Sequence, residues 1–249
     1  MKKIAIAAAI LVLATVPALA QDANTAGQAA KNLLPDVDLS TSSKMIQYVI
    51  LITALSLAPT LVVMTTSFTR IIVALSFLRS GLGMQTTPAN IIIVSLALVL
   101  TGYVMAPTID QAWTNGIKPF SDGQISQNEA IDKTAAPFRV FMQHNVREKE
   151  LALFQDLAVQ AEFGPQPSAD DLRILVPAFM ISELRRGFEI GFLIILPFLI
   201  IDIAVATITM SMGMMMLPPT VLSLPFKVMF FVLIDGWSLL VGNLVRSFH

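Results

Sequence analysis

The feature that most constrains this chain is a long apolar run from Ile190 to Leu217, in which Asp202 is the only charged side chain. About 20 apolar residues cross the hydrocarbon core of a bilayer as a helix. Three further apolar runs, at 45–78, 91–105 and 221–245, also have helical length, and only 13% of the chain is charged. This pattern predicts an all-α protein with two long apolar helical hairpins, an apparent four-span membrane protein.

The first 20 residues have the form of a secretory signal peptide. Lys2 and Lys3 precede the apolar run Ile4 to Val16, and Ala18-Leu19-Ala20 is a small-x-small cleavage pattern. We expect cleavage after Ala20, with an uncleaved anchor helix as the alternative. Without Lys2 and Lys3, the 16 basic residues fall to 14 against 17 acidic residues, a balance that argues against nucleic-acid binding.

The remaining chain divides into four segments. A polar flexible leader is expected over 21–44, and the first apolar hairpin over 45–109. Residues 110–173 form a polar insert. It contains two breaks, "DGQIS" and "GPQPSADD", and the apolar residues between these breaks have helical spacing. We expect this insert outside the cytoplasm, on the periplasmic side. The second apolar hairpin covers 174–249, with a methionine-rich turn at its tip.

Charged side chains inside apolar segments need partners, because each costs roughly 2.5 to 3.5 kcal/mol at mid-membrane. Glu183 and Arg186 have i,i+3 spacing, and Arg185 and Glu189 have i,i+4 spacing. Both spacings place the side chains on one face of a helix. We therefore expect this part of the helix largely to neutralise itself.

Asp202 and Lys227 have no such local partner. If the hairpin turns near Pro218, they differ in height by about 10 Å at 1.5 Å per residue, and Asp202 lies level with Asp235, a like charge. Paired carboxylates of this kind could form a proton relay. A structural contact at a subunit interface is favoured, because no third titratable group continues the path.

Two prolines, Pro197 and Pro225, could bend the helices and change this register. Without such a bend, a neighbouring subunit or a water-filled lumen must satisfy Asp202 and Lys227. The sequence therefore predicts an oligomer.

The sequence carries no recognisable catalytic site. There is no cysteine, and the two histidines, His144 and His249, lie in the polar insert and at the last residue. No HExxH, GxSxG or complete phosphate loop is present. We predict no enzyme activity, no cofactor and no metal centre.

Five methionines crowd the tip of the second hairpin: Met210, Met212, Met214, Met215 and Met216. Three interpretations stay open on physical grounds. Ordinary apolar filler ranks first, a flexible constriction repeated around a ring of subunits second, and a thioether site for Cu(I) third.

Four long motifs make the sequence recognisable. They are "MTTSFTRIIVALSFLRSGLG", "PFSDGQISQNEAIDKTAAPFRVFM", "ILVPAFMISELRRGFEIGF" and "PFLIIDIAVATITMSMGMMMLPPTVLSLPFKVMFFVLIDGWSLLVGNLVRSF". Together they resemble the FliP family, the P subunit of the bacterial flagellar type III protein export gate. The resemblance covers nearly everything from about residue 45 to 248.

This resemblance implies a channel-forming subunit that passes unfolded flagellar proteins across the inner membrane. It implies a ring of P subunits, expected to be pentameric, with the sister subunits FliQ and FliR, the components FlhA and FlhB, and the assembly factor FliO. Met214 to Met216 match the family's gasket, which closes the channel. Asp202, Lys227 and Asp235 match its intramembrane charges, and we interpret them as intersubunit contacts, together with Glu183, Arg185 and Arg186.

Arg185-Arg186-Gly187 departs from the less basic stretch expected after "SEL" and leaves the partners of Glu183 and Glu189 open. Two alternatives to the flagellar function remain. One is the equivalent subunit of a virulence injectisome, because the injectisome homologues share the same core as the flagellar proteins. The signal peptide, the leader and the acidic insert favour the flagellar member. The other is a Met-lined copper or ion transporter that uses Asp202 as a carrier site.

Overall fold

The computed structural model describes residues 48–49, 52–53, 56, 60, 63–84, 89–160, 168, 170–213 and 218–248. The chain divides into two compact units, Met1–Val63 and Met64–His249. In the first unit, the described positions from 48 to 60 are helical, and Thr53 Oγ1 donates to the Val49 carbonyl oxygen at 2.7 Å. The predicted cleavage site and the leader lie outside the described residues.

The second unit is built from helices. In chain order these are α4 (Phe68–Gly81), α5 (Asn90–Ala112), the π-helix η1 (Trp113–Ile117), α6 (Lys118–Ser121), α7 (Gln127–Asn145), α8 (Glu148–Gln160), α9 (Leu172–Ser211), α10 (Pro219–Leu233) and α11 (Gly236–Arg246). None of the described residues lies in a strand. For that part of the chain, the predicted all-α class is confirmed.

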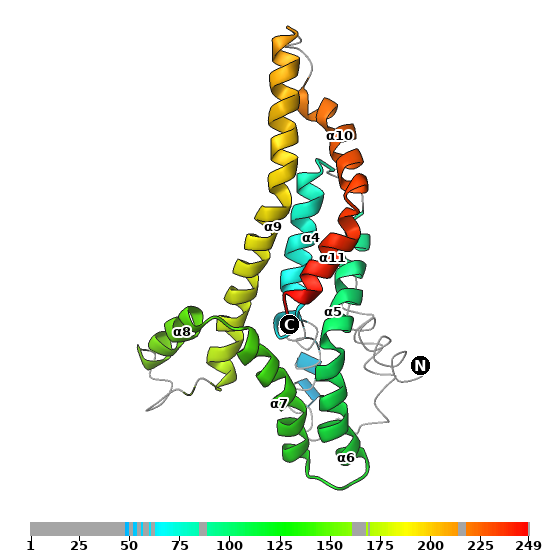
Figure 1. The fold of residues 1–249 in the computed structure, drawn as a ribbon. Helices are drawn as coiled ribbons and strands as arrows, with labels where there is room; N and C mark the ends of the chain where they lie inside the picture. The colour runs from blue at the N-terminus through cyan, green and yellow to red at the C-terminus, as the bar shows by residue number, and fades with distance from the viewer. Residues whose placement is uncertain are drawn as a thin grey trace. The chain divides into compact units, whose positions relative to one another are not determined.

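Helix α4 lies at the centre of this unit, between α9 on one side and α5 and α11 on the other (Figure 1). Its buried side chains form one apolar core with side chains of α5, α9, α10 and α11. The helix starts after a turn at residues 65–67, where Thr66 Oγ1 accepts from Phe68 N at 3.4 Å. The run predicted as one helix from 45 to 78 is therefore broken, because hydroxyl side chains compete for backbone hydrogen bonds.

Helix α5 passes through residue 109, the predicted boundary of the polar insert, without a break. With η1 and α6 it forms one helical stretch of 32 residues, Asn90–Ser121. At the π-helix, a Cβ added to Gly116 would lie 2.2 Å from Thr134 Oγ1 of α7, so only glycine permits this close approach. The insert is thus joined to the apolar part by a continuous helix rather than by a loop.

The insert itself contains α7 and α8. Ser126 caps α7 by accepting from Glu129 N at 3.4 Å, at the predicted "DGQIS" break. The helices are separated at Val146 and Arg147, where Arg147 N donates to Ser182 Oγ of α9 at 3.1 Å. This bond holds the α7–α8 junction against α9.

Helix α9 has 40 residues and is about 60 Å long at 1.5 Å per residue. Gly187 and Gly191 are four residues apart, so they share the face that meets α4. A Cβ at Gly191 would lie 2.5 Å from the Phe77 ring, and one at Gly187 would lie 3.1 Å from Val73. The two glycines therefore allow the close α4–α9 contact, as small residues do between membrane helices.

The return helix predicted over 221–245 is instead two helices, α10 and α11, bent by 65°. Asp235 between them has φ 52 and ψ 51, a left-handed conformation that cannot continue an α-helix. Gly236 follows, and a Cβ there would lie 2.3 Å from the Phe231 ring. Backbone conformation and close packing together produce the bend.

Within the described residues, two helices are long and apolar enough to cross a membrane, Asn90–Ser121 and Leu172–Ser211. The bent pair α10–α11 would make a third. Helix α4 has 14 residues, fewer than the roughly 20 needed. The described part of the chain thus shows two or three candidate spans rather than the four predicted.

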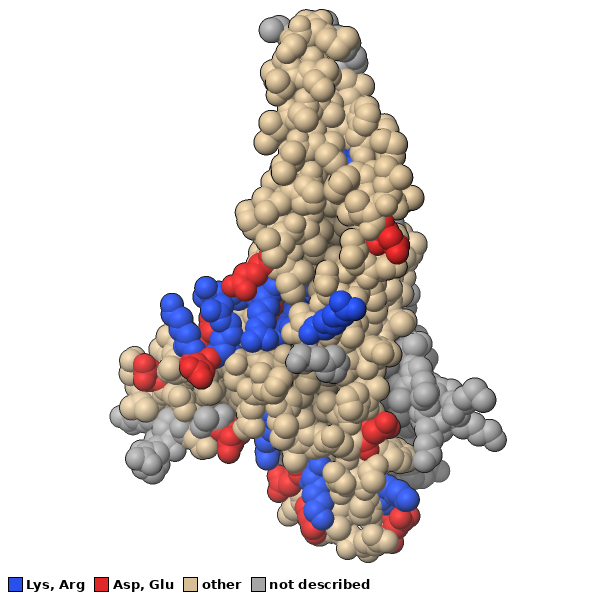
Figure 2. Space-filling view, viewed as in Figure 1, with Lys and Arg blue, Asp and Glu red and all other residues tan. Residues whose placement is uncertain are grey.

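Charged side chains are unevenly distributed over this unit. On the face in Figure 2 they gather over α7, α8 and the adjoining part of α9, whereas the α9–α10 hairpin shows almost none. The same hairpin exposes many large apolar side chains, such as Ile200, Ile203, Val221 and Met229. Its surface therefore suits lipid or other protein chains rather than water.

Candidate functional site

The first candidate site is a buried ion pair between Arg70 of α4 and Glu183 of α9, both fully excluded from solvent. Arg70 Nε donates to Glu183 Oε2 at 2.9 Å, and Nη2 donates to Glu183 Oε1. Nη2 also donates to Asn145 Oδ1 at 3.3 Å, and Nη1 donates to the carbonyl oxygen and hydroxyl of Ser247 at 2.6 and 3.0 Å. All five N–H groups of the guanidinium thus have acceptors.

The face of the same guanidinium is covered by an aromatic ring. Arg70 Cζ lies 3.7 Å from the centroid of the Phe248 ring, a cation–π contact. We call Arg70, Glu183, Asn145, Ser247 and Phe248 the Arg70 centre. It joins α4, α7, α9 and the segment after α11, and its charges are paired and hydrogen-bonded, as buried charges must be.

A second ion pair holds the α9–α10 hairpin. Lys227 of α10, which is 4% exposed, donates from Nζ to Asp202 Oδ2 of α9 at 2.6 Å and to the Gly81 carbonyl oxygen of α4 at 3.0 Å. Asp202 Oδ1 accepts from Ser223 Oγ at 2.5 Å. We call these four residues the Lys227 centre. Since Gly81 ends α4, the ammonium also meets the negative end of that helix dipole.

The contact between Asp202 and Lys227 contradicts the register estimated from the sequence. Asp202 lies nine residues before Ser211, the end of α9, and Lys227 lies eight residues after Pro219, the start of α10. The turn is therefore centred before Pro218, and the two charges are level.

This register shows that the two charges need no neighbouring subunit to satisfy them, so the step from unmatched charges to an oligomer was wrong. The assignment of Asp202 and Lys227 as intersubunit contacts remains a prediction without that support.

A third cluster lies at the junction of α7, α8 and α9 and forms a closed ring of two arginines and two glutamates. Glu150 lies 3.6 Å from both Arg147 and Arg185, and Glu189 lies 3.5 Å from Arg147 and 3.1 Å from Arg185. The predicted Arg185–Glu189 pair is confirmed. Arg185 and Glu189 are about half exposed and Arg147 is partly exposed, so the ring contributes less per pair than the buried centres.

The predicted pairing of Glu183 with Arg186 is wrong. The carboxylate of Glu183 faces α4 and pairs with Arg70. Arg186 is half-buried and, among the described residues, forms no ion pair. Helical spacing identifies neighbours on one helix, but it contains no information on the facing helix.

Asp235, the third predicted intramembrane charge, belongs to neither centre. It is exposed at the α10–α11 bend and makes no side-chain cap to α11. In the part of the chain that the structure describes, no cation lies within ion-pair distance of it. It is not level with Asp202, so the structure does not bring together the two carboxylates that a relay would need.

The methionine-rich turn lies at the end of α9. Met210 and Met212 are 63% and 67% exposed, and Gly213, with φ 75, ends the helix. Met214, Met215 and Met216 lie outside the described residues. Among those described, no group of three or more His, Cys, Asp or Glu side chains is placed to hold a metal ion.

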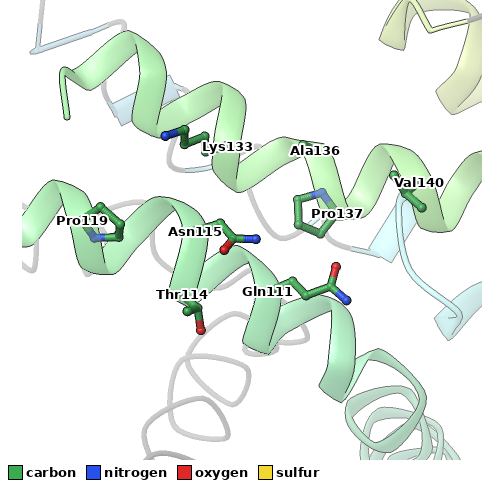
Figure 3. A pocket seen from close by; sticks show the side chains of 8 residues that line it. All are labelled: Gln111, Thr114, Asn115, Pro119, Lys133, Ala136, Pro137 and Val140. Atoms are coloured by element: carbon green, nitrogen blue, oxygen red, sulfur yellow. The ribbon is translucent and has the colours of Figure 1, made fainter. Parts of the chain in front are cut away.

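The insert has an open groove of about 580 Å³ between η1 and α7. Gln111 and Asn115 line one side, and Lys133, Ala136 and Pro137 line the other (Figure 3). Lys133 is already paired with Glu129 at 2.9 Å. The lining amides can form hydrogen bonds, but they supply no acid, base or nucleophile for catalysis.

Sequence reasoning missed the Arg70 centre as a site. Arg70 is a charge inside an apolar run, but nothing in the local sequence around it, Asn145 or Ser247 indicates this site, because Asn145 and Ser247 lie 75 and 177 residues from Arg70. The Lys227 centre was half found, since Asp202 and Lys227 were identified while Ser223 and the Gly81 carbonyl were not.

Comparisons with known proteins agree on one family. The sequence profile described as the FliP family matches residues 51–244. The flagellar biosynthetic protein FliP of Agrobacterium fabrum (strain C58) is 54% identical over 244 residues, covering 96% of this chain and 97% of the relative. That of Rhizobium meliloti (strain 1021) is 60% identical over 215 residues, covering 85% and 87%.

A more distant relative matches over a similar length. The flagellar biosynthetic protein FliP of Bacillus subtilis (strain 168) is 44% identical over 218 residues, covering 87% of this chain and 98% of the relative. The family profile includes α4 to α10 and most of α11, and with them the Arg70–Glu183 pair and the Lys227 centre. The resemblance inferred from the four motifs is confirmed, and the chain belongs to the FliP family.

Proposed function

We propose that this chain is a channel-forming subunit of the flagellar type III export gate in the bacterial inner membrane. Unfolded flagellar proteins pass through a pore built from several copies and the sister subunits. Between transport events the methionine-rich turns close that pore. The chain catalyses no reaction, and energy is supplied by other components.

Family membership supports the flagellar part of this proposal. The relatives that match over most of this chain are named flagellar biosynthetic proteins. FliQ, FliR, FlhA, FlhB and FliO are the expected protein partners, and exported flagellar proteins the expected cargo. No observation in the described residues favours an injectisome or a copper transporter over this assignment.

The apolar surface of α9 supports assembly with other chains. Large exposed apolar side chains run along it from Ile181 to Met212, about 46 Å at 1.5 Å per residue. The hydrocarbon core of a bilayer is only about 30 Å thick. Part of this surface therefore needs cover from protein rather than lipid, as a ring of copies would provide.

The observation that carries the gating proposal is the way the hairpin presents its tip. The Lys227 centre fixes α9, α10 and the end of α4 together. Beyond it, α9 continues for nine residues and ends in exposed Met210 and Met212. Methionine is unbranched and flexible, so a cluster at such a tip can pack against differing surfaces.

Replacing Met214, Met215 and Met216 together with alanine tests the gate. We expect cells that make the complete export apparatus to leak ions and small molecules through the closed pore, because alanine is too short to fill it. Leakage is measured as dissipation of the membrane potential, with flagellar assembly scored in the same cells.

Met229→Ala is the matched control, because Met229 is also exposed on the hairpin, at 55%, but lies on α10 away from the tip. It should leave leakage unchanged. If the triple variant does not leak but loses bound Cu(I), the gasket proposal is wrong and copper transport becomes the better interpretation. Protein that stays monomeric when co-produced with FliQ and FliR would contradict the shared pore.

A further inference from the structure

An apolar groove lies between α4, the start of α5 and the α10–α11 bend, with a volume of about 280 Å³. Its floor is buried core, including Leu78 and Phe231 at 3% and 7% exposure. Its rim is open, since Ile92, Val232 and Trp237 are 55%, 69% and 46% exposed. The lining is too apolar for a polar metabolite, but it suits part of a hydrocarbon chain.

Among the described residues that line this groove, Arg79 is the only charged one. It is half-buried in the last turn of α4. Among the described residues, no carboxylate lies within ion-pair distance of its guanidinium, and its side chain donates no hydrogen bond. As far as the described residues go, this cation beside apolar walls is available to bind an anion.

We propose that this groove binds one phospholipid, whose acyl chain lies along the apolar floor and whose phosphate pairs with Arg79. The guanidinium suits a phosphate because it can donate two parallel hydrogen bonds to it. An anionic head group is favoured over a zwitterionic one, because none of the described residues that line the groove is acidic and could balance Arg79.

The surroundings of the groove fit a lipid boundary. Its walls include the start of α5 and the bent pair α10–α11, both with membrane-spanning character. Trp237 lies on the rim, and tryptophan is enriched at the interface between lipid and water, where arginine side chains also reach the head groups. Charge, apolar lining and the interfacial aromatic residue thus point to the same ligand.

The test uses the full-length chain in nanodiscs of phosphatidylcholine with increasing phosphatidylglycerol, and native mass spectrometry counts the lipids that stay bound. We expect Arg79→Gln to weaken retention of phosphatidylglycerol by about tenfold or more, since hydrogen bonds to charged groups are worth at least that factor. Arg79→Lys, which keeps the charge but not the two parallel bonds, should lie between.

Val232→Asp provides a second variant at an exposed rim position and should repel the phosphate without disturbing the core. Arg246→Gln is the matched control, because Arg246 is exposed and has no ion pair among the described residues but does not line the groove. Equal retention by wild type, Arg79→Gln and Val232→Asp would overturn the proposal.

A photoreactive residue at position 237 in the assembled complex distinguishes lipid from protein. Crosslinking to phospholipid supports the proposal, whereas crosslinking to another polypeptide overturns it. Neither result depends on pore gating, so failure here is separable from failure of the proposed function.

Discussion

The Arg70 centre and the Lys227 centre use the same two helices but differ in how completely they are closed. Each takes one group from α4 and a carboxylate from α9, and each holds a segment of the returning chain. In the Arg70 centre the cation is on α4 and all five of its N–H groups have acceptors. In the Lys227 centre the cation is on α10, and the Asp202 side chain is 28% exposed.

This difference separates a permanent contact from an adjustable one. A fully buried ion pair cannot be opened without leaving a charge stranded, whereas a partly exposed carboxylate can be hydrated when its partner leaves. The Arg70 centre therefore fixes the frame formed by α4, α7 and α9. The Lys227 centre closes the hairpin with an ion pair that costs less free energy to break.

The largest effect is expected from Arg70→Met. It leaves Glu183 buried without a partner, which destabilises by about 3–5 kcal/mol. Chemical denaturation of the full-length protein in detergent measures this change. The double variant Arg70→Met with Glu183→Leu should recover part of the loss, and a double variant worse than either single change would contradict a coupled pair.

Lys227→Met should be less damaging, at about 1–3 kcal/mol, because it removes charged hydrogen bonds but leaves Asp202 access to water. The same denaturation experiment compares it with Arg70→Met. A loss as large as that of Arg70→Met would show that both centres are equally closed. Asp202→Asn keeps an oxygen acceptor for Ser223 but leaves the buried Lys227 ammonium without a counter-charge, so it should cost at least as much as Lys227→Met.

Phe248→Leu tests the cover over the Arg70 guanidinium. Leucine keeps apolar volume but has no ring, so we expect a loss of about 0.5–2 kcal/mol from the cation–π contact. Phe248→Tyr keeps the ring and should stay close to wild type. If the Phe248→Leu protein were as stable as wild type, the Phe248 ring would contribute only apolar packing.

The smallest effect is expected at Asp235, which belongs to neither centre. Asp235→Asn should change stability by no more than about 0.5 kcal/mol, because asparagine tolerates the left-handed conformation and no ion pair is lost. Asp235→Ala should cost about 1 kcal/mol or more, since alanine does not. A large loss in export by the stable Asp235→Asn variant would indicate that its charge serves another chain.

Much of the fold follows from local pattern. The helices α7 and α9 start after the predicted breaks "DGQIS" and "GPQPSADD", and the described parts of the apolar runs do form helices. The break between α7 and α8 was not predicted. The breaks inside two runs were not predicted. One depends on hydroxyl groups near Thr66 and the other on the conformation of Asp235, and neither changes the apolar periodicity.

The candidate site was predictable only where its residues were locally unusual. Asp202 and Lys227 stood out as charges in apolar surroundings, but their pairing depends on where the turn is centred, and Pro218 gave a misleading position for it. Arg70 and Glu183 lie 113 residues apart, so their contact follows from packing along Gly187 and Gly191 rather than from spacing.

The position of the Lys227 centre sets the mechanics of the hairpin. The part of α9 beyond Asp202 and the part of α10 before Lys227 form two arms of nearly equal length, about 13 Å each at 1.5 Å per residue. The arms can tilt about the ion pair, and a tilt of about 15° displaces the methionines at their ends by roughly 3 Å. If hairpins of this kind ring the pore proposed above, it can widen at its narrowest point while the helices below the ion pair stay in place.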